Sequence, residues 1–105
     1  MERKKFTVDF EGVCYYSDVH KAIKKGLKLT EYYGENLDAL WDRLTDMIDN
    51  ETEIFLNNYH YVEKADKDYA EKLLAVFRDA KHCDDDAYAD ARIAFERNGE
   101  IIDLE

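Results

Sequence analysis

The chain begins with an alternation of apolar and polar residues over positions 6–10, a pattern typical of a β-strand with one polar face. Glu11-Gly12 then predicts a turn. Further strands are expected at residues 52–56 and 92–96, where short apolar runs occur. An Asn98-Gly99 turn and an apolar tail follow the last of these strands.

Three segments with apolar residues at helical spacing separate these strands. The first begins near Ser17, which is expected to cap it, and the second is opened by Asn36. The third spans about residues 66–81. Strands separated by helices imply right-handed parallel crossovers. The sequence therefore predicts an α/β fold, a small three-stranded parallel sheet packed with three to four helices, in a single domain over residues 1–105.

The second helix carries an apolar stripe and, on a different face, an unusual concentration of carboxylates. The stripe consists of Leu37, Leu40, Trp41, Leu44 and Ile48. The acidic face consists of Asp38, Asp42, Asp46 and Asp49, with Glu35 if the helical turn extends back to it. Like charges four residues apart repel each other on a helix. Arg43, the only basic residue nearby, is expected to point elsewhere.

The third helix has a different charge pattern. It places opposite charges four residues apart, Lys67 with Glu71 and Asp68 with Lys72, and ends with the basic residue Lys81. An unfavourable pattern with no compensation, as in the second helix, marks a candidate functional site. A merely solvated face of an acidic protein explains the carboxylates equally well on the pattern alone.

The charge of the chain limits its partners. Its 15 Lys and Arg residues and 25 Asp and Glu residues give a formal net charge of −10, which repels nucleic acid and anionic membranes and attracts basic proteins. No apolar run reaches transmembrane length, and no signal peptide is recognised. The two cysteines, Cys14 and Cys83, are expected to remain thiols. We therefore expect a cytoplasmic protein, monomeric when free, that binds neither nucleic acid nor membranes.

The sequence offers little for catalysis. The cluster over residues 82–86 lacks the paired spacing of a zinc site, and the four glycines form no phosphate loop. Ser17 has no recognisable base partner in the pattern. The sequence thus predicts no enzyme, no metal and no cofactor. A small metal-dependent hydrolase built on the acidic helix is the alternative, and the missing His ligands argue against it.

One segment resembles a known family closely. It reads Tyr32-Tyr33-Gly34-Glu35-Asn36-Leu37-Asp38-Ala39-Leu40-Trp41-Asp42. This run resembles the signature of the barstar family, intracellular inhibitors of barnase-like ribonucleases. Ser17-Asp18-Val19-His20 upstream and Val76-Phe77-Arg78-Asp79-Ala80-Lys81 downstream support it in the expected order. The resemblance covers roughly residues 6–96.

The resemblance implies a barstar-like fold and a protein that plugs the cleft of a basic, extracellular-type ribonuclease. Asp42 would occupy the position of the substrate phosphate, Tyr32 would stack in the cleft, and Asp79 would meet a basic residue from the neighbouring helix. The implied partner-binding set is Tyr32, Glu35, Asn36, Asp38, Trp41, Asp42, Thr45, Asp46 and Asp79. His20 and Tyr33 are expected to pack or hydrogen-bond, and Gly34 to supply a backbone conformation that other residues resist.

The chain departs from the family pattern at several positions. The departures are Thr30 in place of a proline, Arg43 in place of a cysteine, Asp46 in place of a small residue, Met47 in place of an aromatic residue, and Asp79 in place of a glutamate. They leave the predicted fold intact but bear on the partner. The alternative is therefore a barstar-fold module that neutralises a different basic protein or toxin domain.

Overall fold

The computed structural model describes residues 4–31, 33–48, 52–82 and 91–104. Two helices follow each of the first two strands, and a final pair of strands ends the described chain. In order they are β1 (Lys4–Asp9), α1 (Tyr16–Gly26), α2 (Leu37–Met47), β2 (Thr52–Asn57), α3 (His60–Ala65), α4 (Lys67–Lys81), β3 (Arg92–Arg97) and β4 (Glu100–Asp103). The α/β class predicted from the sequence is confirmed. The short helix α3 lies in a stretch for which the sequence pattern predicted no element.

The sheet has four strands in the order β1-β2-β3-β4, so the prediction of three strands is wrong. The first three strands are parallel, as predicted, and β4 is antiparallel to β3. The extra strand is the apolar tail, folded back by the Asn98-Gly99 turn. Both turn residues have positive φ, 52° and 88°, which suits a two-residue hairpin.

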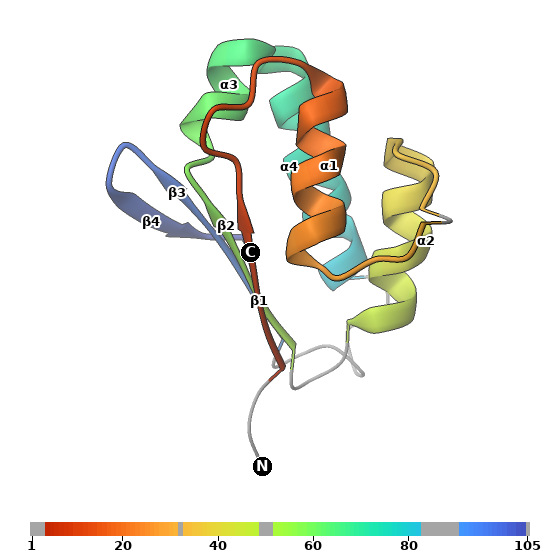
Figure 1. The fold of residues 1–105 in the computed structure, drawn as a ribbon. Coiled ribbons are helices and arrows are strands. Elements are labelled where there is room, and N and C mark those ends of the chain that lie inside the picture. The colour runs from red at the N-terminus through yellow and green to blue at the C-terminus, as the bar shows by residue number, and fades with distance from the viewer. Residues whose placement is uncertain (1–3, 32, 49–51, 83–90, 105) are drawn as a thin grey trace.

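The helices are arranged in layers on one face of the sheet (Figure 1). Helix α1 packs against β1, and α4 packs against β3. Helix α2 packs against α4 and lies farther from the sheet. On the opposite face of the sheet, Arg92 bridges Glu53 at 3.6 Å and Asp103 at 2.8 Å. This layering leaves the outer side of α2 at the surface.

Helix α1 begins differently from the prediction. The N-cap is Tyr15 and not Ser17, which lies inside the helix. The Asp18 carboxylate, three positions after the cap, accepts the backbone N–H of Tyr15 at 3.3 Å. A carboxylate at that position satisfies a free N–H at the helix start and favours the positive end of the helix dipole. The capping hydrogen bond at the start of α1 therefore comes from Asp18 and not from Ser17, to which the sequence pattern assigned it.

The core lies between the sheet and α1 and α4, and it extends to α2. Ile23 of α1, Leu40 and Leu44 of α2, and Leu73 and Phe77 of α4 have no exposed surface. No helix among the described residues is long and apolar enough to span a membrane. Burial of these side chains fixes α2 on α4 and so determines where the acidic face points.

Candidate protein-binding site

The site begins with Asn36, which joins the preceding loop to α2. Asn36 is the N-cap, as predicted, and its side-chain oxygen accepts the N–H of Ala39 at 2.8 Å. Its amide nitrogen donates to the carbonyl of Gly34 at 3.2 Å. One side chain therefore satisfies a free donor of the helix and holds the loop in a fixed position.

The residue of this loop that adopts an unusual backbone conformation is Glu35 and not Gly34, contrary to the sequence-based prediction. Glu35 has φ of 52°, in the left-handed region that few non-glycine residues occupy. Gly34 serves a different purpose, because a Cβ there would lie 3.2 Å from the Cβ of Ala39. The missing side chain lets the loop approach the first turn of α2. Packing of the loop on α2 thus holds Glu35, an exposed residue, in a backbone conformation that is costly for a side chain of its type.

A buried chain of hydrogen bonds anchors the loop from below. The Tyr33 hydroxyl lies 2.7 Å from Nδ1 of His20 on α1, and Nε2 of His20 bonds the hydroxyl of Tyr69 on α4. Burial lowers the pKa of His20, although the nearby Glu35 carboxylate acts in the opposite direction. Burial first, and then Tyr69 and Glu35, raise the pKa of Tyr33. The predicted packing and hydrogen-bonding roles of His20 and Tyr33 are confirmed.

The outer face of α2 carries the carboxylates. Asp38, Asp42 and Asp46 are all exposed, as the helical projection predicted. Arg43 does not point away from them, since its Nη2 lies 3.1 Å from Oδ2 of Asp46. The prediction for Arg43 is wrong because its long side chain reaches the residue three positions on. Both side chains of this pair remain about half exposed or more, so the pair adds little stability.

Two further predicted contacts, Trp41 and Thr45, line the edge of this face. Trp41 is half-buried and packs against the core. Thr45 is also half-buried, and its hydroxyl donates back to the helix, towards the carbonyls of Trp41 at 3.0 Å and Asp42 at 3.2 Å. Both residues thus combine a structural contact with a partly exposed surface.

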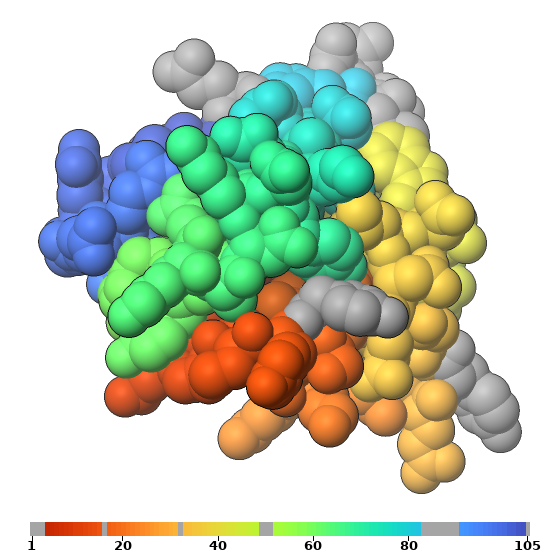
Figure 2. Space-filling model, turned by 90° about the horizontal axis from the view of Figure 1, so that it is seen from above, coloured from red at the N-terminus to blue at the C-terminus, as the bar shows by residue number. Residues whose placement is uncertain are grey.

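Asp79 does not lie on α2 but on α4, the helix that packs against it. It is exposed on α4. The end of α4 lies next to α2 at the surface, cyan beside yellow (Figure 2). The structure therefore brings the two helices that carry the predicted set together. Tyr32, from the predicted set, and Asp49, from the predicted acidic face, lie outside the described residues.

Between the loop and α2 the surface is hollowed beside Asp42, a feature that the sequence pattern did not predict. This hollow has a volume of about 290 Å³ and is lined by Thr30, Tyr33, Gly34, Ala39, Asp42 and Arg43. Its walls combine small residues and the side chain of Tyr33 with the carboxylate of Asp42 and the guanidinium-bearing side chain of Arg43. Such a hollow suits one flat side chain that carries both hydrogen-bond donors and acceptors. The hollow exists only because the loop packs on α2. In the sequence, the small residues Gly34 and Ala39 are the one sign that the loop and the helix approach closely.

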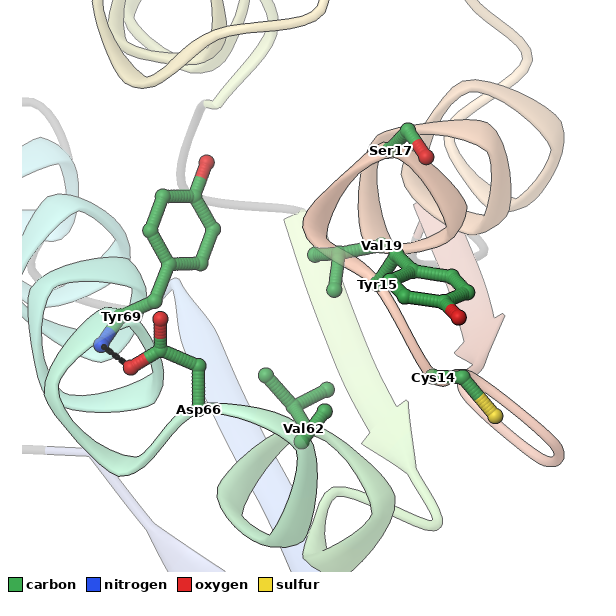
Figure 3. Close-up of a pocket in the computed structure, with 8 residues that line it drawn as sticks. Cys14, Tyr15, Ser17, Val19, Val62, Asp66 and Tyr69 are labelled. Carbon is green, nitrogen blue, oxygen red and sulfur yellow. Dashed lines mark hydrogen bonds between the residues drawn. The ribbon is translucent and has the colours of Figure 1, made fainter.

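A separate hollow of about 420 Å³ lies between the start of α1 and the junction of α3 and α4. Asp66 and Tyr69 face Cys14, Tyr15 and Ser17 across it (Figure 3). The Asp66 carboxylate accepts the backbone N–H of Tyr69 at 3.1 Å, so it caps α4. Across the part of the chain that the structure describes, no group of three His, Cys, Asp or Glu side chains is placed to hold a metal.

These features define a small α/β module that presents carboxylates from one helix on a rigid base. The chain belongs to the Barstar family, because the family model described as "Barstar (barnase inhibitor)" matches residues 3–96. It is also 36% identical, over 73 residues, to the Bacillus subtilis (strain 168) protein named "Putative ribonuclease inhibitor YrdF". That match covers 70% of this chain and 77% of the relative.

Proposed function

We propose that this chain inhibits a basic ribonuclease of the barnase type by inserting α2 and the preceding loop into its active-site cleft. The observation that carries the proposal is the set of exposed carboxylates on α2 beside the hollow at Asp42. Membership of the Barstar family and the name of the Bacillus relative support the same role. The binding set is the one that the sequence predicted, with Tyr32 included.

The chemistry of the proposed contact is imitation of a phosphate. A ribonuclease cleft binds an anionic backbone with arginine, lysine and histidine side chains. A carboxylate accepts paired hydrogen bonds from an arginine much as a phosphate does. Asp42 would take the central position, with Asp38 and Glu35 towards the loop and Asp46 towards the end of the helix. Asp79, on α4, would contact a basic group at the edge of the cleft.

The rigidity of the site favours tight binding. The Asn36 cap and the His20–Tyr33–Tyr69 hydrogen bonds hold the loop before any partner arrives. A preformed surface loses less conformational entropy on association. The chain would thus block the nuclease by occupying its cleft and would catalyse no reaction itself. A free monomer in the reducing cytoplasm would fit this role.

The test is titration of a purified barnase-type ribonuclease with the chain, measured as cleavage of a fluorogenic RNA substrate. Full inhibition at a one-to-one ratio is expected, and Lys67→Ala serves as a surface control that leaves it intact. Absence of inhibition, together with capture of a different basic protein, would favour the alternative of a module with another target. RNA cleavage by the chain alone, abolished in a carboxylate variant, would overturn the inhibitory role.

The net charge of −10 adds an expectation about rates. Long-range attraction between an acidic inhibitor and a basic nuclease accelerates their encounter, and salt screens it. The association rate constant, measured by stopped-flow fluorescence, is therefore expected to fall steeply as ionic strength rises. A rate independent of salt would contradict an electrostatically steered interface.

A further inference from the structure

Helix α1 concentrates positive charge in an otherwise acidic protein. A surface hollow of about 530 Å³, here called the lysine groove, is lined by Lys21, Lys24, Lys25, Lys28, Leu29 and Glu35. A neighbouring hollow of about 490 Å³ shares Lys25 and Lys28 and adds Lys5 of β1. This second hollow also includes Asp9 and Glu11, so the positive charge is concentrated in the lysine groove, along α1 towards the loop before α2.

The four lysines of the groove are not used within the fold. None of their side chains forms an ion pair or hydrogen bond with any residue that the structure describes, whereas Arg43, Arg92 and Arg97 all pair with carboxylates. Lys24 and Lys25 lie in the last turn of α1, where they favour the helix dipole. That effect does not account for Lys21, which lies before the last turn. The groove is thus available for an external anion.

The groove adjoins the candidate binding site through Glu35, which belongs to both. An interface of ordinary size buries about 800 Å² on each partner. Helix α2 has 11 residues, so it is about 16 Å long and, with one outer face of about 10 Å width, too small to supply that area alone. A partner centred on Asp42 must therefore extend beyond α2, and the lysine groove adjoins this surface because it shares Glu35 with the predicted binding set.

We propose that the partner that binds α2 also covers the lysine groove and presents acidic side chains to it. This inference rests on the proposed function. A partner that is basic over its whole contact surface would be repelled by Lys21, Lys24 and Lys28. A partner with an acidic patch beside its basic cleft is attracted at both places. The groove thus selects the orientation of the nuclease and rejects basic proteins without such a patch.

The experiment compares two charge reversals with equal net charge. Lys21→Glu/Lys24→Glu changes the groove, and Lys67→Glu/Lys72→Glu changes exposed lysines in the first half of α4. The probe is the barnase-type ribonuclease used for the inhibition test, and the readout is the association rate constant at low and high salt. The α4 variant is expected to associate faster, because added negative charge strengthens long-range attraction. The groove variant is expected to associate about three- to tenfold more slowly than the parent.

The opposite signs separate the local effect from the effect of net charge. Faster association of the groove variant, by as much as in the α4 variant, would overturn the proposal. Lys21→Gln/Lys24→Gln provides a milder test with a smaller expected slowing if the reversal disturbs the fold. Loss of inhibition in Asp42→Ala alongside faster association of the groove variant would leave the proposed function standing and reject the groove. Full inhibition by Asp42→Ala would reject the proposed function itself.

Discussion

Helices α2 and α4 pack against each other, and each presents an apolar stripe to the same core. Leu40 and Leu44 of α2 are as completely buried as Leu73 and Phe77 of α4. Their outer faces differ. Helix α2 exposes Asp38, Asp42 and Asp46 and has no basic residue in its last turn, whereas α4 mixes both charges and ends with Arg78 and Lys81.

This difference separates the part of a helix that holds the fold from the part that is available for a partner. Burial of one leucine stabilises by about 2 kcal/mol, and repulsion between two exposed carboxylates four residues apart costs a few tenths of a kcal/mol. The inner stripe of α2 therefore outweighs the unfavourable outer face. On α4, no ion pair joins Lys67 to Glu71 or Asp68 to Lys72 among the described residues, so its mixed charges mainly avoid repulsion.

The comparison is tested most strongly by truncating two carboxylates on α2 and one on α4. Asp42→Ala is expected to weaken inhibition by about 2–5 kcal/mol or more, because it leaves the cations of the nuclease buried and unpaired. Asp38→Ala should cost less, and Asp79→Ala less again, because Asp79 is one methylene shorter than the glutamate of the family pattern. Inhibition constants for the three variants give the order. Equal losses at Asp42 and Asp79 would contradict a site centred on α2.

The inner faces are compared with Leu44→Ala on α2 and Leu73→Ala on α4. Both side chains have no exposed surface, so each truncation is expected to lower the free energy of unfolding by about 2–5 kcal/mol. Urea denaturation of the two variants measures this. A loss below about 1 kcal/mol for Leu44→Ala alone would show that α2 is not held as firmly as α4.

The stability of the protein should depend on pH through the hydrogen bonds that join the loop before α2 to α4. His20 links the loop before α2 to Tyr69 of α4, and burial lowers its pKa from the ordinary value of 6.5. The unfolded chain therefore binds more protons below pH 6.5, so the stability present above that pH is lost as the pH falls. We expect the unfolding free energy to decrease from pH 7 to pH 5.

The matched variants for this prediction are His20→Gln and His82→Gln. His20→Gln should flatten the pH dependence of the unfolding free energy between pH 5 and 7, since the titrating group is gone. His82→Gln makes the same substitution at an exposed histidine, so the difference in slope between the two variants measures the contribution of position 20. An unchanged slope in His20→Gln would assign the acid sensitivity to other groups.

The smallest expected effects come from neutralising one outer charge on each helix. Asp42→Asn removes repulsion from Asp38 and Asp46 and should raise the free energy of unfolding by a few tenths of a kcal/mol, about 0.5 at most. Glu71→Gln on α4 removes a carboxylate flanked by Lys67 and should lower it by a similar amount. Thermal unfolding of both variants at low salt checks the two signs. Destabilisation by Asp42→Asn would mean that the acidic face supports the fold.

Local patterns in the sequence, within a few residues, were enough to predict where several helices and strands lie and which of their side chains are exposed. Helical spacing placed the buried stripe and exposed carboxylates of α2, and Asn36 marked its start correctly. The alternation near the N-terminus identified β1. These predictions succeed because neighbours one helical turn or one strand step apart fix which face a side chain occupies, whatever the remainder of the chain does.

Tertiary structure decided the features that depend on distant partners. The tail became β4 because β3 offered an open edge, and His20 meets Tyr69 across 49 positions of sequence. The strained conformation of Glu35 and the hollow beside Asp42 follow from packing the loop on α2. The lysine groove reaches Glu35 only because α1 and that loop lie together. Contacts between segments far apart in sequence depend on how the whole core packs, which no local pattern encodes.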